Sequence, residues 1–161
     1  MPHITPNLWF DTNGLEAAEF YVSVFPNSKI TGVTNYTSAG PGPEGTPVVV
    51  DFELDGQPYT AINGGPDFTF NEAISLLINC DGQEEVDYYW DKLTADGGQE
   101  IQCGWLKDKY GLSWQVWPVQ ANSFVASDDP EVAARATQAM FTMKKIDLAA
   151  MQAAAHQNVN A

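Results

Sequence analysis

The sequence is poor in basic residues, with seven Lys and Arg against 21 Asp and Glu among its 161 residues. The formal net charge at pH 7 is −14. A surface of this sign repels the phosphate backbone of nucleic acids and the anionic headgroups of membranes. The composition therefore disfavours nucleic-acid and membrane partners, and we interpret the acidity as a source of solubility.

Long apolar runs are also missing, and we expect no signal peptide. No stretch approaches the roughly 20 apolar residues that a membrane-spanning helix requires. The first six residues, MPHITP, lack the basic region and the apolar stretch of a signal peptide. We therefore expect a cytoplasmic protein.

Cysteine and histidine are scarce as well. Two cysteines, Cys80 and Cys103, are too few for a disulfide framework, so we expect free thiols in a reducing cytosol. One of the two histidines, His3, lies near the start of the sequence and the other, His156, lies in the tail that follows the last predicted helix.

The sequence does contain one pattern of apolar segments written twice. The first half predicts a strand over 4–10, a helix over 15–25 and strands over 28–36, 47–54 and 57–62. The second half predicts a strand over 73–79, a helix over 83–93 and strands over 100–105 and 112–119. An offset of about 68 residues aligns the first strands and helices, and one of about 55 aligns the last strands. We interpret each half as a βαβββ unit, with an additional Gly- and Pro-rich loop over 38–46 in the first half.

A third section follows the two repeats. Asp129, Pro130 and Glu131 form a strong helix start, because an acidic cap and a proline at the first helical position both favour a helix N-terminus. Methionines 140 and 143 lie on one stripe of this helix, which either covers the core or joins a dimer partner. A second helix is predicted over 147–155.

Three blocks of the sequence resemble the PhnB-like branch of the vicinal-oxygen-chelate superfamily, which includes glyoxalases and bleomycin-binding proteins. The blocks are residues 4–11 with 17–25 (ITPNLWFD and AAEFYVSVF), residues 103–116 (CGWLKDKYGLSWQV) and residues 139–147 (AMFTMKKID). The resemblance implies two βαβββ modules curved around a cup, and a homodimer. Sequences of this branch often carry the label 3-demethylubiquinone-9 3-methyltransferase. The chain lacks the Gly-rich strand-to-helix turn of common S-adenosylmethionine-dependent enzymes, which gives that label little physical support.

The resemblance also implies where a metal would bind. Superfamily enzymes hold a divalent ion with His, Gln or Glu from both halves, and the last ligand is usually a Glu at the position of Gln115. A neutral amide is a weaker ligand for a divalent ion than a carboxylate. The other expected positions fall near Ile4 and near Ile74 or Ser75, which are poor ligands, and His3 would point to the opposite strand face. We therefore expect no metal and no cofactor.

We expect a ligand pocket on the sheet face that carries Gln115. Alternation along the last strand places Trp117 on this face, and Trp114 and Val116 on the opposite face. The residues that catalyse a reaction, if any, are not identified by the sequence. The candidate pocket residues are Trp105, Gln115, Trp117, Glu53 and Cys103.

Carboxylates and a thiol offer further chemistry. Asp51 and Glu53 share one strand face, where paired carboxylates raise one another's pKa, and Asp108 is a third possible acid or base. Cys103 shares a predicted strand face with Trp105, but no neighbouring histidine activates it, so we interpret it as an inert thiol. The segment from Asn63 to Pro66 is interpreted as the linker between the halves.

The predicted fold class is α+β, with two βαβββ modules forming a curved mixed sheet and a C-terminal helix. The predicted divisions are 1–65, 66–122 and 123–161. Three functions fit the sequence: metal-free binding of a small, partly apolar molecule, a metal-assisted superfamily enzyme, and the methyltransferase of the family label.

Overall fold

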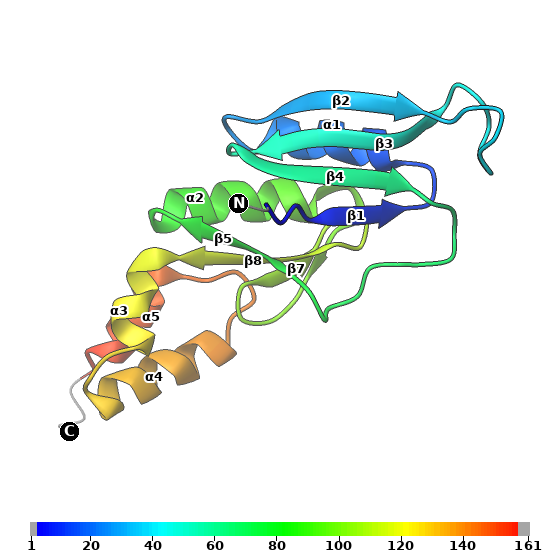
Figure 1. The fold of residues 1–161 in the computed structure, drawn as a ribbon. Coiled ribbons are helices and arrows are strands. Elements are labelled where there is room, and N and C mark those ends of the chain that lie inside the picture. Colours follow the sequence, from blue (N-terminus) through cyan, green and yellow to red (C-terminus); the bar gives the residue numbers. More distant parts are fainter. Residues whose placement is uncertain (1–2, 158–161) are drawn as a thin grey trace. The chain divides into compact units, whose positions relative to one another are not determined.

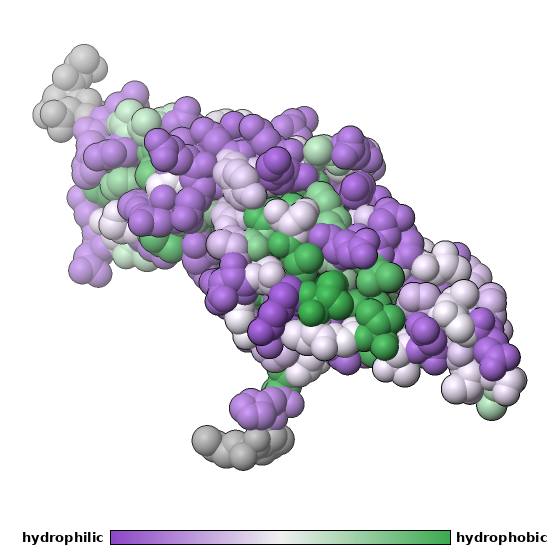
Figure 2. Space-filling model, turned by 90° about the horizontal axis from the view of Figure 1, so that it is seen from above, coloured by the Kyte–Doolittle hydropathy of each residue, from purple (hydrophilic) through white to green (hydrophobic). Residues whose placement is uncertain are grey.

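The computed structural model describes residues 3–157 and divides into two compact units, Met1–Phe70 and Asn71–Ala161. Figure 1 shows strands and helices in both, which makes the fold α+β. Within the described residues, no helix combines the length and the apolar character that crossing a bilayer requires. Figure 2 shows one face of the molecule, where hydrophilic side chains predominate around a smaller hydrophobic cluster.

The first unit is a βαβββ module. Its elements are β1 (Asn7–Phe10), α1 (Gly14–Val24), β2 (Lys29–Asn35), β3 (Pro47–Leu54) and β4 (Gln57–Asn63). The strand order is β1-β4-β3-β2, with β1 parallel to β4 and the other pairs antiparallel. Helix α1 packs on one face of this mixed sheet (Figure 1).

Alternation along β3 separates the two faces of the first sheet. Val50, Phe52 and Leu54 are buried in the core, whereas Asp51 and Glu53 are half-buried on the other face. The Tyr21 ring of α1 stacks on Phe52 with a centroid distance of 6.5 Å. The helix therefore covers the apolar face and leaves the carboxylates on the opposite one.

The second unit repeats the module and adds helices. Its sheet is β5-β8-β7-β6, with β5 parallel to β8. The elements are β5 (Leu76–Cys80), α2 (Gly82–Thr94), β6 (Gln99–Glu100), β7 (Trp105–Lys107), β8 (Ser113–Pro118), α3 (Asn122–Val125), α4 (Pro130–Phe141) and α5 (Leu148–Ala155). Short 3-10 turns occupy Ala95–Gly97 and Val119–Ala121.

The predicted strand over 100–105 is wrong. Cys103 and Gly104 adopt positive φ values of 60° and 81°, which an extended strand does not permit. Their amides turn away from the sheet and donate to the Met143 and Lys144 carbonyls, both at 2.8 Å. Because this stretch is a loop, Cys103 and Trp105 do not share a strand face.

Two predicted strands begin later than expected. The N-terminal strand starts at Asn7, and Ile4 is 92% exposed. The first strand of the second unit starts at Leu76, because the Asn71 side chain accepts from the Ala73 amide at 2.9 Å and forms a turn. Strands β2, β3, β4 and β8 begin and end within one residue of their predicted bounds, whereas β6 and β7 replace the single strand predicted over 100–105.

The two predicted C-terminal helices are confirmed, as is the acidic cap of the first, and the structure adds a cap to the second. The Asp129 carboxylate accepts from the Glu131 amide, and the Asp147 carboxylate accepts from the Ala150 amide, both at 2.9 Å. The short helix α3 was not predicted. These helices bury a cluster of Ala121, Ile146 and Met151, against which Trp117, Phe124, Val125, Met140, Met143 and Leu148 pack. Met140 of α4 and Met143, which lies beyond the end of α4 and not on its stripe as predicted, both pack against the core of their own unit.

Candidate functional site

The second unit leaves one face of its sheet free of α2. We call this the open sheet face and define it by Ser75, Leu77, Trp105 and Gln115. Strand pairing places Leu77 and Trp105 on either side of Gln115. Leu77 is 52% exposed, and both Trp105 and Gln115 are half-buried. An exposed leucine beside a half-buried indole and an amide offers a surface that is apolar with one polar centre.

Gln115 and Ser75 hydrogen-bond to each other across this face. The Gln115 Nε2 atom donates to the Ser75 Oγ atom at 2.9 Å. These are two of the positions where the superfamily resemblance implies metal ligands. An amide and a hydroxyl are weak ligands for divalent ions, but together they retain further donor and acceptor capacity. The pair is therefore suited to hydrogen-bonding a neutral oxygen or nitrogen group.

One end of the second sheet holds a buried hydroxyl. Ser113 pairs with Lys107 in the same register that pairs Gln115 with Trp105, so its side chain lies on the same sheet face. The Ser113 Oγ atom is buried and has no hydrogen-bond partner among the described residues. Lys107 forms an ion pair with Glu72 and lowers the pKa of that carboxyl by hydrogen bonding.

Trp117 lies on the predicted face of β8 but packs against the C-terminal helices. Its indole Nε1 atom donates to the Asn122 Oδ1 atom at 2.8 Å, and its ring contacts the cluster around Ile146. Trp114 and Val116 are buried on the opposite face, as the alternation predicted. The role of Trp117 in a ligand pocket stays a prediction, and the structure adds a packing role.

The candidate acids occupy three different settings. Glu53, half-buried on β3, forms an ion pair with Lys29 at 3.7 Å, and Asp51 lies beside Gly32 of the neighbouring strand. Asp108 is 3% exposed and accepts hydrogen bonds from the Tyr110 amide and the Trp114 Nε1 atom, both at 2.8 Å. Its contacts hold the turn before β8, which gives Asp108 a structural role.

The two thiols also differ. Cys80 is fully buried, and burial, with the Glu85 charge, raises its pKa to about 12. Cys103 is half-buried, and the hydrogen bond from its backbone N–H to the Met143 carbonyl holds it in a left-handed turn. Among residues 3–157, no three His, Cys, Asp or Glu side chains gather into a group that could hold a metal ion.

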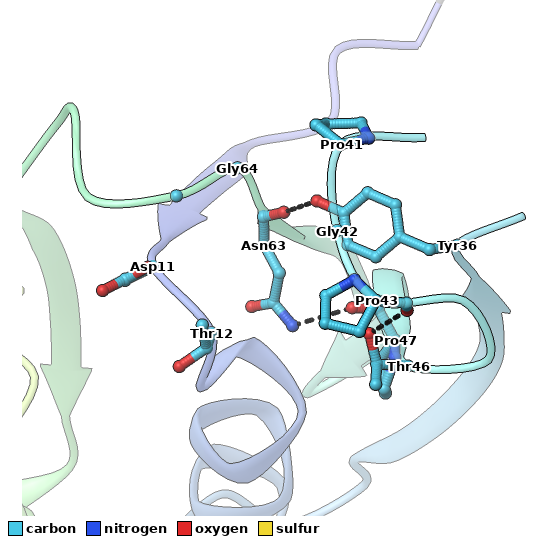
Figure 3. Close-up of a pocket in the computed structure, with 11 residues that line it drawn as sticks. Asp11, Thr12, Tyr36, Pro41, Gly42, Pro43, Thr46, Pro47, Asn63 and Gly64 are labelled. Atoms are coloured by element: carbon cyan, nitrogen blue, oxygen red, sulfur yellow. Dashed lines mark hydrogen bonds between the residues drawn. The ribbon is translucent and has the colours of Figure 1, made fainter. Parts of the chain in front are cut away.

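The first unit contains a pocket that the sequence did not predict, which we call the loop pocket (Figure 3). Its volume is about 410 Å³. It lies where the Gly- and Pro-rich loop meets the ends of β1 and β4. The lining residues are Asp11, Thr12, Tyr36, Pro41, Gly42, Pro43, Thr46, Pro47, Asn63, Gly64 and Gly65.

Sequence comparison places the chain in a family. The sequence model of the 3-demethylubiquinone-9 3-methyltransferase family matches residues 2–117. The chain belongs to this family. A solved putative 3-demethylubiquinone-9 3-methyltransferase, a PhnB protein from Bacillus cereus, shares 38% identity over 71% of this chain and 97% of its own, with a TM-score of 0.64. The family resemblance of the first two sequence blocks is thereby confirmed, and the match ends before residues 139–147.

A more distant solved structure shares the fold, and others are similar to the chain at a lower level. A protein from Pseudomonas aeruginosa is 18% identical over 71% of this chain and 95% of its own, with a TM-score of 0.57. A possible glyoxalase from Bacillus cereus is 13% identical over 70% of this chain and 96% of its own, with a TM-score of 0.46. No curated protein matches the sequence.

Proposed function

We propose that this PhnB-family protein binds a small, partly apolar molecule on the open sheet face without a metal ion. The supporting observation is the 2.9 Å hydrogen bond between Gln115 and Ser75, with Trp105 and the exposed Leu77 beside it. Apolar walls around a few polar groups are typical of small-molecule sites. Of the predicted pocket residues, Trp105 and Gln115 lie on this face, and the ligand-pocket roles of Trp117, Glu53 and Cys103 stay predictions.

Thermal unfolding in the presence of a chelator tests the proposal. A library of small neutral molecules is screened, and we expect hits that raise the melting temperature by several degrees. Each hit is repeated with Gln115→Ala and Trp105→Ala, which should remove the shift, and with Lys109→Ala, an exposed turn residue, which should retain it. Metal-free binding at this face would be contradicted if the shifts appeared only with added divalent ions, or if neither substitution removed the shift of any hit.

The family label supports a second candidate, a methyltransferase acting on a demethylubiquinone-type substrate. Its specific support is the family match over residues 2–117. Such an enzyme must bind its methyl donor, so calorimetric titration with S-adenosylmethionine decides the question. We expect no heat of binding, and saturable binding at one site per chain would favour the methyltransferase.

A homodimer and a cytoplasmic location complete the proposal, together with the three-part organisation 1–65, 66–122 and 123–161. The acidic composition, with a net charge of −14, supports a protein free of nucleic acid and anionic membranes. Light scattering at several concentrations tests the dimer, which predicts twice the mass of one chain throughout.

A further inference from the structure

The loop pocket has an apolar wall made of rigid groups. Tyr36 directly follows β2, and Pro41 and Pro43 belong to the loop over 38–46. Figure 3 shows these three residues on the side opposite Asp11 and Thr12. Proline rings lose almost no side-chain entropy when a ligand packs on them. A wall of this kind favours flat, apolar groups.

Three polar side chains of the loop pocket, those of Tyr36, Thr46 and Asn63, are already hydrogen-bonded within the protein. The Asn63 amide accepts from the Gly14 amide at 2.8 Å and donates to the Pro47 carbonyl at 3.0 Å. The Tyr36 hydroxyl donates to the Asn63 carbonyl, and the Thr46 hydroxyl donates to the Pro43 carbonyl at 2.6 Å. A ligand here gains most from apolar contact, because these groups need no new partner.

Backbone hydrogen bonds join the two ends of the Gly- and Pro-rich loop. The Tyr36 amide donates to the Thr46 carbonyl at 2.8 Å, and the Gly45 amide donates to the Tyr36 carbonyl at 2.9 Å. Gly42 lies so close to the Tyr36 ring that a Cβ atom would overlap it. A preformed pocket reduces the entropy lost on binding.

The charge near the loop pocket limits which ligands can bind there. The exposed Asp11 carboxylate lines the rim, and the whole chain carries a net charge of −14. Both disfavour an anion. We propose that the loop pocket is a second binding site, separate from the open sheet face, and that it takes an uncharged aromatic or heteroaromatic ring compound packed against Tyr36 and the prolines.

Two matched probes test this inference on the full chain: 2-naphthol, which is neutral at pH 7, and 2-naphthoate, which is an anion of similar shape. Amide resonances are followed by two-dimensional NMR during each titration. We expect 2-naphthol to shift the amides of Gly42, Gly64 and Gly65, with saturation, and 2-naphthoate to bind more weakly. Shifts that gather on Leu77, Trp105 and Gln115 instead, or no saturable shifts at all, would overturn the proposal and leave the first site untouched.

Substitutions locate the contact. Tyr36→Ala removes the ring and should weaken 2-naphthol binding by about tenfold, whereas Tyr36→Phe keeps the ring and should retain most of it. Tyr88→Ala removes an exposed aromatic ring of the second unit and should change nothing. Asp11→Asn should strengthen the binding of 2-naphthoate by about two- to fivefold and leave the binding of 2-naphthol unchanged. Equal affinities for 2-naphthol in Tyr36→Ala and the unsubstituted chain would refute the assignment.

Discussion

The two units build the same module to different degrees of completeness. In the first, β2 and β3 span Lys29–Asn35 and Pro47–Leu54 and complete the sheet by themselves. In the second, β6 and β7 cover only Gln99–Glu100 and Trp105–Lys107. The carbonyls of Met143 and Lys144 accept hydrogen bonds from backbone amides of the loop between these two strands. A repeated module can therefore lose strand length where a distant segment supplies the missing hydrogen bonds.

The turns before the last strands give the sharpest contrast. Asp108→Asn should destabilise the protein by about 3 kcal/mol, because the buried carboxylate accepts from the Tyr110, Leu112 and Trp114 N–H groups. Asp55, in the corresponding turn of the first unit, is exposed, and Asp55→Asn should cost less than about 0.5 kcal/mol. Urea unfolding of both variants checks the difference, and equal losses would contradict it.

The next prediction tests whether the second unit depends on its C-terminal segment while the first unit does not. Ile146→Ala removes a fully buried side chain of the helical cluster and should cost about 3 kcal/mol. The amides of Cys103 and Gly104 should then exchange faster with solvent, since their acceptors are only a few residues from Ile146. The amides of β2 serve as the internal control, and faster exchange there would mean that the units do not differ in this way.

Gln83 joins α2 to the same segment. Its Nε2 atom donates to the Ile146 carbonyl at 2.9 Å, and its Oε1 atom accepts from the Leu148 amide at 2.8 Å. Gln83→Ala should cost about 1–2 kcal/mol in urea unfolding. Gln57→Ala, an exposed residue of the first unit, is the matched control and should leave the free energy of unfolding nearly unchanged.

The two thiols, both in the second unit, should respond differently to pH and to a thiol reagent. The raised pKa of Cys80 means that the folded state keeps this proton more tightly than the unfolded chain, whose cysteines titrate near about 8.5. The resulting stabilisation is complete below about pH 8 and is lost as the pH rises toward about 12. With a thiol reagent at pH 8, we expect Cys103 to react fast and Cys80 only on unfolding. Mass spectrometry identifies the labelled residue.

The smallest expected effect is at Lys145. Its ion pair with Asp87, at 2.8 Å, raises the pKa of Lys145 and lowers that of Asp87. Both side chains are more than a third exposed, so solvent screens the pair, and Lys145→Met should cost at most about 0.5 kcal/mol. The loss should shrink in high salt, and a larger, salt-independent loss would indicate a packing role instead.

Periodicity predicted most of the fold because the helices and long strands bury one face at a regular spacing. It failed at residues 101–104, where the acceptors of Cys103 and Gly104 lie about 40 positions away and no local pattern reveals them. The loop pocket was missed because its Gly- and Pro-rich loop was interpreted only as a connection. The sequence signal for this pocket was Tyr36, at the end of a predicted strand, followed by the prolines 41, 43 and 47.

Because the second unit needs the carbonyls of Met143 and Lys144, we expect its folding to finish after that of the first unit. Synthesis proceeds from the N-terminus, so the first unit has all the residues of its sheet once Asn63 has emerged from the ribosome. The loop between β6 and β7 must wait for some 40 further residues before its amides find their acceptors. During that interval the nascent second half is the part that molecular chaperones would engage.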